Sequence, residues 1–219
     1  MKTVIFRVDG NKNIGMGHVI RCMALASAFF NKGYQIIYAM SDDTLKNRIL
    51  KHGFGFMCVD SKYDDYNYHA TVFLKYVKVT VPSLVVVDNY SVSSNYLSRI
   101  RELTTTMFIS EEYDSDKVNS VDYFLNYNVY MNSVVPIKSS STQLLGTRYT
   151  LLREEFGRPL RVKSSENKTI TIFTGGSDLY NVSEALVQHL ISRDSLKEYQ
   201  IRVVSGELNP NISSIASSN

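Results

Sequence analysis

Residues 7–29 of the chain read RVDGNKNIGMGHVIRCMALASAF and join two different hydrophobic patterns. The apolar segment TVIFRV at residues 3–8 runs into this stretch and predicts a β-strand. After three glycines, apolar residues recur at helical spacing from His18 to Lys32, and Gly33 follows where a helix commonly ends. The pattern predicts a strand, a glycine-rich turn and a helix that begins at His18.

The same alternation of strand and helix signals continues along the chain. Further strands are predicted at residues 34–40, 54–60, 83–90, 105–112 and 122–128. Helices are predicted between them at residues 41–53, 64–78 and 91–103. Ser41, Asp42 and Asp43 are expected to cap the helix at residues 41–53. The segment SLVVVDNY at residues 83–90 has four apolar residues in a row, as is typical of a parallel strand buried on both faces. Repeated βα units predict an α/β fold with a parallel sheet, in which ligands bind beyond the carboxyl ends of the strands.

We expect an N-terminal Rossmann-like domain at residues 1–155, a linker at residues 156–167 and part of a second domain at residues 168–219. Residues 129–167 contain a serine run and the charged stretch RVKSSENK, and we interpret them as a crossing segment and linker. The last part predicts a strand, a TGGSD turn, a helix and a second strand. One such β-α-β unit is too small to bury a core alone, so we expect it to be held by packing on the first domain, by packing on a neighbouring chain, or by nothing at all.

The composition argues against several classes of protein. The formal net charge is +3 and the basic residues are scattered, which does not favour nucleic acid as a partner. No apolar run is long enough to span a membrane, and the N-terminus does not resemble a signal peptide, so we expect a cytoplasmic protein. Cys22 and Cys58 lie in helical and strand patterns and are expected to be buried and reduced; no metal-ligand spacing or cofactor motif is present.

The turn GMGH at residues 15–18 is the first candidate site. A helix N-terminus presents unpaired N–H groups, and glycines allow a phosphate or a sugar to approach the backbone. The third glycine of a dinucleotide fingerprint is replaced by Ile20, and no P-loop sequence follows. His18 is either a surface histidine or a general base that the helix dipole keeps neutral.

Three other stretches carry groups suited to the same kind of site. Asp88-Asn89-Tyr90 ends the apolar strand, so it is either ordinary strand-end polarity or places a tyrosine donor in a cleft. Residues 174–178, TGGSD, form a second strand-to-helix turn that is either a plain turn or an anion site. Arg148 and Arg153 either clamp a diphosphate or lie on a solvated face.

These stretches occur in one order that resembles a known family. The matching pieces are FRVDGNKNIGMGHVIRCMALA, VVVDNY, DYFLNYNVY, RYTLLREEF and TGGSD, which span residues 6–178. The pattern resembles the UDP-sugar hydrolases of pseudaminic acid synthesis, the PseG/SpsG-like group, which is related in fold to the MurG-type GT-B glycosyltransferases.

The resemblance implies a GT-B-like fold, with two Rossmann-like domains and both glycine turns facing one cleft. It implies hydrolysis of a UDP-activated diacetamido-trideoxyhexose to UDP and free sugar, by attack of water at the anomeric carbon with inversion and without a metal. His18 matches the base of the family and Tyr90 its active-site tyrosine. The residues expected to bind substrate are Asp9, Gly15, Met16, Gly17, Asp88, Arg153, Gly175, Gly176 and Ser177.

The chain departs from the family pattern at two points. The tyrosine of the family usually follows a histidine or a serine, whereas Asn89 precedes Tyr90 here. The resemblance implies a glutamate that binds uridine and a later asparagine, both from the second domain, and neither has a counterpart in these 219 residues. We therefore expect this chain to bind UDP-sugar weakly and to turn it over poorly or not at all. The alternatives are a GT-B glycosyltransferase that passes the sugar to an acceptor hydroxyl, and a truncated, non-catalytic protein that binds a nucleotide sugar.

Overall fold

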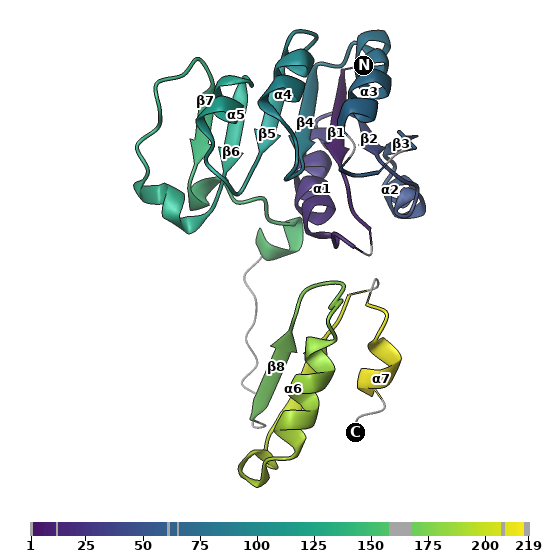
Figure 1. Ribbon diagram of the computed structural model, residues 1–219, viewed down its shortest axis with the longest axis vertical. Helices are drawn as coiled ribbons and strands as arrows, with labels where there is room; N and C mark the ends of the chain where they lie inside the picture. The colour runs from purple at the N-terminus through teal and green to yellow at the C-terminus, as the bar shows by residue number, and fades with distance from the viewer. Residues whose placement is uncertain are drawn as a thin grey trace. The chain divides into compact units, whose positions relative to one another are not determined.

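The computed structural model describes residues 2–11, 13–60, 62–64, 66–157, 168–206 and 209–216. The chain divides into two compact units, one made of residues 1–9 and 18–157 and the other of residues 10–17 and 158–219 (Figure 1). The predicted linker at residues 156–167 lies outside the described residues from residue 158 onward.

The first unit is built on a parallel sheet of seven strands in the order β3-β2-β1-β4-β5-β6-β7. The strands are β1 (Thr3–Val8), β2 (Gln35–Met40), β3 (Gly55–Cys58), β4 (Leu84–Asp88), β5 (Thr106–Ile109), β6 (Tyr123–Asn126) and β7 (Thr142–Leu145). The predicted parallel α/β sheet is confirmed, and its order is that of a Rossmann-like fold. The order reverses between β1 and β4, and in such sheets this is where a crevice opens at the carboxyl ends of the strands.

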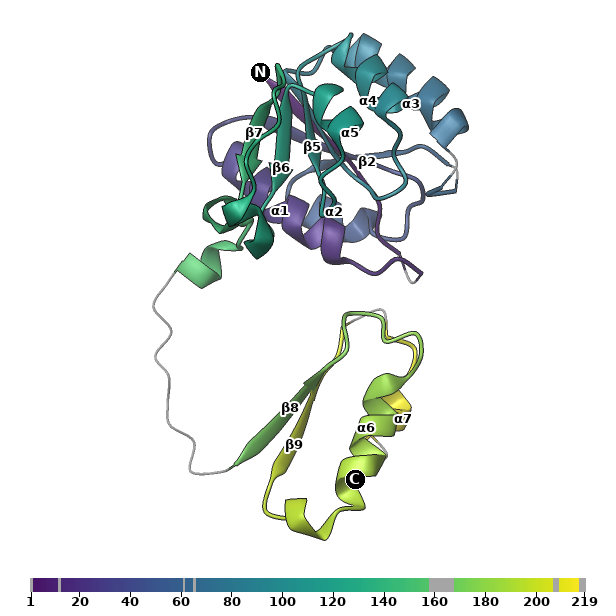
Figure 2. The ribbon, with the colours of Figure 1, turned by 60° about the vertical axis from the view of Figure 1, so that its left-hand side comes forward.

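Helices cover both faces of this sheet. The helices are α1 (Gly17–Phe30), α2 (Lys46–Lys51), α3 (Tyr66–Thr80), α4 (Ser94–Arg101) and α5 (Ser115–Asn119), with 3₁₀ turns at Val129–Ser133, Thr147–Tyr149 and Glu154–Gly157. Figure 2 shows α1 and α2 on one face and α3, α4 and α5 on the other. Val85, Val86 and Val87 of β4 are consequently all buried, as the apolar run in this strand predicts.

Three local predictions for the first unit are wrong. Helix α2 begins at Lys46 rather than after a cap at residues 41–43, because the Asp42 carboxylate accepts the backbone N–H of Thr44 in a turn instead. Strand β7, at Thr142–Leu145, lies within residues 129–167, which are expected to form a crossing segment and linker without a strand. It is a short edge strand, and the serine-rich and threonine-rich sequence around it hides the strand pattern. Cys58 is exposed rather than buried, because β3 forms the other edge of the sheet.

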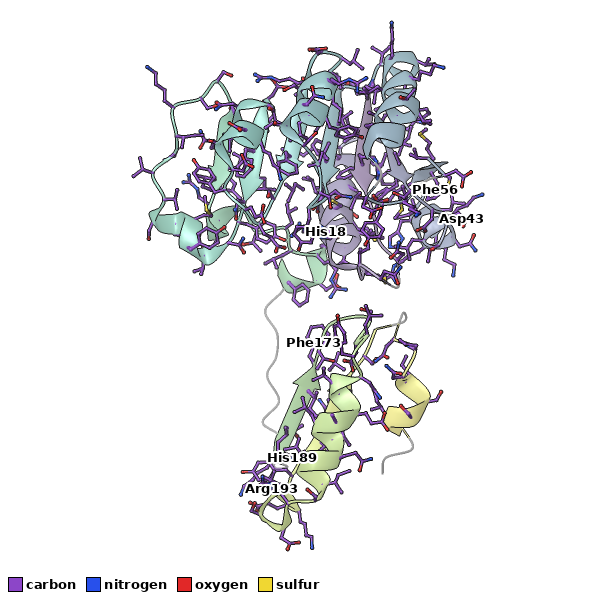
Figure 3. The ribbon with its side chains drawn as sticks, viewed as in Figure 1. His18, Asp43, Phe56, Phe173, His189 and Arg193 are labelled. Atoms are coloured by element: carbon purple, nitrogen blue, oxygen red, sulfur yellow. The ribbon has the colours of Figure 1, made fainter. Side chains whose placement is uncertain are left out.

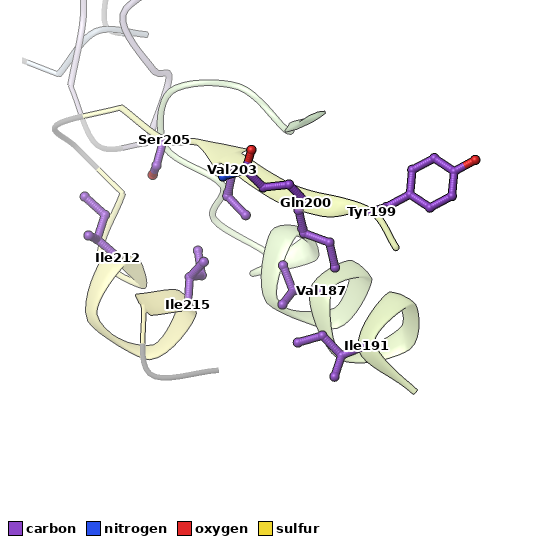
Figure 4. Close-up of a pocket in the computed structure, with 9 residues that line it drawn as sticks. Val187, Ile191, Tyr199, Gln200, Val203, Ser205, Ile212 and Ile215 are labelled. Atoms are coloured by element: carbon purple, nitrogen blue, oxygen red, sulfur yellow. The ribbon is translucent and has the colours of Figure 1, made fainter. Parts of the chain in front are cut away.

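The second unit contains a two-stranded parallel sheet of β8 (Thr169–Phe173) and β9 (Gln200–Val204), joined through α6 (Val182–Ile191). A 3₁₀ turn at Asp194–Leu196 and a short helix α7 (Ile212–Ala216) complete the described part, and α7 is an addition to the predicted elements. Residues of α6, β9 and α7, among them Val187, Val203 and Ile215, line a groove of about 590 Å³ (Figure 4). The order of β8, α6 and β9 and the parallel pairing of the two strands confirm the predicted β-α-β arrangement of this part.

No helix among the described residues has the length and the apolar character needed to cross a membrane.

Candidate functional site

The glycine loop between β1 and α1 is closed by its own backbone. The N–H of Gly15 donates to the carbonyl of Asn11 at 2.9 Å, and the Asn11 side chain accepts the N–H groups of Asn13 and Ile14. Gly15 has φ +73°, a conformation that other residues rarely adopt. A Cβ on Gly17 would meet no atom of the described residues within 4 Å. The loop thus delivers the chain into α1 with open space beside the backbone of its first residue.

His18, labelled in Figure 3, is the second residue of α1 and is held by a carboxylate at the end of β4. Its Nδ1 lies 2.6 Å from Oδ1 of Asp88, and both side chains are buried. Val8 and Asp88 are register partners in the adjacent strands β1 and β4, so the sheet brings the start of α1 close to this carboxylate. Nη2 of Arg21 also lies 3.0 Å from Nδ1 of His18. Because the carboxylate of Asp88 is the nearer group and can only accept when ionised, we assign the proton to Nδ1, which leaves Nε2 of a neutral imidazole as the acceptor.

Arg21, one turn further along α1, explains why Asp88 stays ionised. Its Nε lies 2.6 Å from Oδ2 of Asp88 and its Nη2 lies 2.7 Å from Oδ1, a two-pronged contact that suits a carboxylate. Burial by itself would raise the pKa of Asp88, but the hydrogen bonds and charges of Arg21 and His18 outweigh it and hold that pKa below its ordinary value. The thiol of Cys22 also points at Oδ2, at 3.4 Å, and burial and Asp88 raise the pKa of this thiol.

Tyr90 packs directly on the histidine. The two rings meet edge to face with their centroids 4.4 Å apart, and the Tyr90 hydroxyl donates to Oε2 of Glu111 at 3.1 Å. The other oxygen of Glu111 accepts from Nη1 of Arg21 at 2.7 Å. Burial raises the pKa of Tyr90, and the Glu111 carboxylate raises it further, so the phenol keeps its proton at neutral pH and acts as a donor.

Asp9 lies at the same edge of the sheet, and both of its carboxylate oxygens accept hydrogen bonds from other groups of the chain. Its Oδ2 accepts from Arg7 at 2.8 Å and from the Asn89 amide at 3.2 Å, and its Oδ1 accepts the backbone N–H of Ser41 at 2.7 Å. Asp9 is 3% exposed and Arg7 2%. These contacts tie together the ends of β1, β2 and β4. The expected role of Asp9 in binding substrate stays a prediction.

The second glycine turn, residues 174–178, also carries an internal carboxylate. Gly175 has φ +88°, and the Asp178 side chain accepts the N–H groups of Val182 and Ser183 at 2.9 and 3.0 Å. These bonds outweigh burial, which alone would raise the pKa of Asp178, and hold that pKa below its ordinary value. Because Asp178 takes the N–H groups of Val182 and Ser183, these two donors of the first turn of α6 are not available to an anion.

Arg153 is not connected to the histidine by any contact among the described residues. It is half-exposed, pairs with Glu155 at 3.0 Å and lies over the ring of Phe156. With Leu152 it borders a groove of about 560 Å³ that α1 and Arg48 also line. Its expected role in binding substrate stays a prediction.

Arg21 and Glu111 are members of this cluster that are not among the expected catalytic or substrate-binding residues. Arg21 lies three residues after His18, a spacing that places both on one helix face, and Glu111 follows β5 at the carboxyl edge of the sheet. The helical spacing of Arg21 and the strand-end position of Glu111 can both be read from the sequence, but neither shows which residue the side chain contacts.

Among the described residues, no cluster of His, Cys, Asp or Glu is arranged to hold a metal ion.

Comparisons with known proteins give distant relatives, and no family model matches the chain. The chain is 27% identical over 223 residues to the uncharacterized protein MJ1062 of Methanocaldococcus jannaschii, covering 94% of this chain and 43% of that protein. It thus spans less than half the length of that relative. It is 24% identical over 216 residues to the UDP-2,4-diacetamido-2,4,6-trideoxy-beta-L-altropyranose hydrolase of Campylobacter jejuni, covering 95% of this chain and 71% of the hydrolase.

Among solved structures, the chain is similar to MurG of Acinetobacter baumannii, with a TM-score of 0.58 and 11% identity. The superposition covers 100% of this chain and 71% of MurG. Together with the strand order, this likeness shows the fold: α/β, Rossmann-like and of the GT-B type.

Proposed function

We propose that the protein hydrolyses a UDP-activated diacetamido-trideoxyhexose, releasing UDP and the free sugar, with water as the nucleophile. The observation that carries the proposal is the contact of 2.6 Å between Nδ1 of His18 and Asp88 at the N-terminus of α1. The relative from Campylobacter jejuni supports the substrate class, because its name describes such a hydrolase. The order of the sequence motifs, which resembles the same group of hydrolases, agrees with it.

In the proposed reaction, Nε2 of His18 takes a proton from water as the water oxygen bonds to the anomeric carbon. The bond between that carbon and the phosphate oxygen breaks, and UDP leaves with the electron pair, which inverts the configuration. Asp88 keeps the imidazole in the required tautomer and stabilises the imidazolium that forms, as in other histidine–aspartate pairs. Tyr90 is proposed as the active-site tyrosine beside the imidazole ring; while its proton is donated to Glu111, its hydroxyl oxygen can still accept a hydrogen bond from the substrate.

The two glycine turns are proposed to bind the sugar diphosphate. Gly15, Met16 and Gly17 lead into the first turn of α1, where N–H groups point outward and favour negative charge. Gly175, Gly176 and Ser177 offer a second set of N–H groups. Oriented donors of this kind stabilise the charge that develops on the leaving diphosphate.

The test is to incubate the protein with the UDP-sugar in ¹⁸O-water and to analyse both products. We expect UDP without ¹⁸O, because the carbon–oxygen bond breaks, and a first-formed sugar of inverted anomeric configuration by NMR. UDP release that requires an added acceptor alcohol would instead indicate a glycosyltransferase, and binding without any release would indicate a non-catalytic protein. Incorporation of ¹⁸O into UDP would overturn the proposed attack at carbon.

A further inference from the structure

We infer that Glu111 is a positioning residue that holds the Tyr90 ring against the imidazole of His18. The inference rests on the proposed function insofar as it assigns this arrangement a role in turnover. The arrangement itself stands on geometry alone.

Tyr90 needs an external restraint because it lies on an open turn. The residue is 57% exposed and follows the end of β4. In the part of the chain that the structure describes, its hydroxyl makes one hydrogen bond, to Oε2 of Glu111. The edge-to-face contact with His18 is the remaining attachment of the side chain, and such ring contacts alone are weak.

Glu111 is suited to supply that restraint because both ends of the residue are held. Its Oε1 accepts from Arg21 at 2.7 Å, and its backbone carbonyl accepts from the Tyr130 hydroxyl and from the Asn128 amide. Arg21 is in turn locked onto Asp88 by two contacts. Because Glu111 is fixed at the edge of the sheet, its hydrogen bond restricts rotation of the Tyr90 side chain.

These contacts form a closed circuit of five side chains. Starting from His18, it passes through Asp88, Arg21, Glu111 and Tyr90 and returns to His18. Two carboxylates flank one guanidinium, so each anion has a cationic partner. In a circuit of this kind, removing one link changes the position of its neighbours as well as its own interaction.

The circuit makes a prediction about turnover. A catalytic group displaced by about 1 Å can lose roughly 100-fold in rate. If Glu111 acts through Tyr90, Glu111→Ala lowers kcat by roughly 10–100-fold with little change in KM, and the double variant Glu111→Ala, Tyr90→Phe is no slower than the slower single variant. Independent, multiplicative losses would contradict action through Tyr90.

A test that needs no substrate is NMR of the imidazole signals. The chain has four histidines, so the His18 signals are assigned by their loss in His18→Asn. Tyr90→Leu removes the ring current of the tyrosine and shifts the His18 signals. We expect Glu111→Ala to shift them in the same direction, and Glu111→Gln, which keeps an oxygen for the Tyr90 hydroxyl, to leave most of the ring-current effect in place.

Glu112→Ala is the matched control, because Glu112 is the exposed neighbour of Glu111, and it should leave both the His18 signals and turnover unchanged. Unmoved His18 signals in Glu111→Ala would overturn the inference. If these signals move as expected but the unaltered protein does not hydrolyse the UDP-sugar, the positioning role stands and the proposed function fails.

Discussion

His18 combines two features that a surface histidine lacks: a place in the first turn of α1 and a buried carboxylate on Nδ1. We predict that His18→Leu lowers UDP release by about 10²–10⁴-fold, the usual loss for a general base, while the protein stays folded. Initial rates of UDP release and near-ultraviolet circular dichroism measure the two effects. His189→Leu is the control, because His189 is an exposed residue of α6 whose ring contacts Arg193. Near-normal release by His18→Leu would remove His18 from the mechanism.

Asp88 ties the stability of the protein to pH through its lowered pKa. The unfolded chain takes up this proton near the ordinary value of about 3.9, whereas the folded chain resists it. The contribution of Asp88 to the free energy of unfolding is therefore fully present above about pH 4. It is lost as the pH falls through the lower pKa of the folded state. We predict that Asp88→Asn lowers the free energy of unfolding at pH 7 by roughly 3 kcal/mol, because Arg21 loses a buried partner. We also predict that the free energy of unfolding of this variant falls less steeply as the pH is lowered.

Urea unfolding between pH 7 and pH 2 measures this effect as the difference between the two proteins. Asp178 also has a lowered pKa and contributes equally to both curves, so the difference isolates Asp88. Asp194→Asn serves as the control, because Asp194 is an exposed surface partner of Lys197. Parallel curves for the natural protein and Asp88→Asn would contradict the assigned role.

At the scale of elements, helix α4 is attached to the sheet by one apolar stripe. Leu97 is fully buried in the core on that face, together with Tyr96 and Ile100. We predict that Leu97→Ala lowers the free energy of unfolding by about 2–5 kcal/mol, from lost burial and the cavity left behind. Chemical denaturation checks this, with Leu103→Ala as a control. Leu103 lies just after α4 and is 40% exposed, so its truncation should cost about 1 kcal/mol or less.

The turns after β8 and β9 pack backbone against backbone. A Cβ on Gly206 would lie 2.4 Å from the carbonyl oxygen of Gly176 and 2.8 Å from its Cα, and neither atom can move without moving the turn. We predict that Gly206→Ala destabilises the second unit by roughly 1–3 kcal/mol and speeds amide exchange at residues 174–177. Gly176→Ala is the control, since its Cβ would meet no described atom within 4 Å. Equal effects of the two substitutions would refute the packing argument.

At the scale of the whole molecule, the two units differ in how much core each contains. The first has a seven-stranded sheet with helices on both faces and a continuous core that includes Phe73, Phe108 and Phe124. The second has two strands, and Ile191 and Ile212 beside its groove are 47% and 44% exposed. We predict that residues 1–157 alone unfold in one cooperative urea transition, whereas residues 168–219 alone show none. A sharp transition in the shorter fragment would contradict this.

Local pattern accounts for much of the fold. The period of the apolar residues predicts β1, α1 and the buried β4, because helices and strands repeat their buried positions at different spacings. The alternation of strands and helices then implies a parallel sheet, and a parallel sheet gathers His18, Asp88 and Tyr90 at one edge. These features are decided within short windows of sequence, so they can be predicted from it.

Other features were decided only when distant segments met. Cys58 is exposed and β7 pairs at an edge because of strand order, which no local pattern encodes. Arg21 reaches Asp88 and Glu111 across 67 and 90 residues of sequence. Which carboxylate a guanidinium contacts depends on sheet register and on side-chain rotamers, and both are set by packing over the whole domain. For this reason the strand ends predict a site, while the circuit that orients His18 and Tyr90 is visible only in the folded molecule.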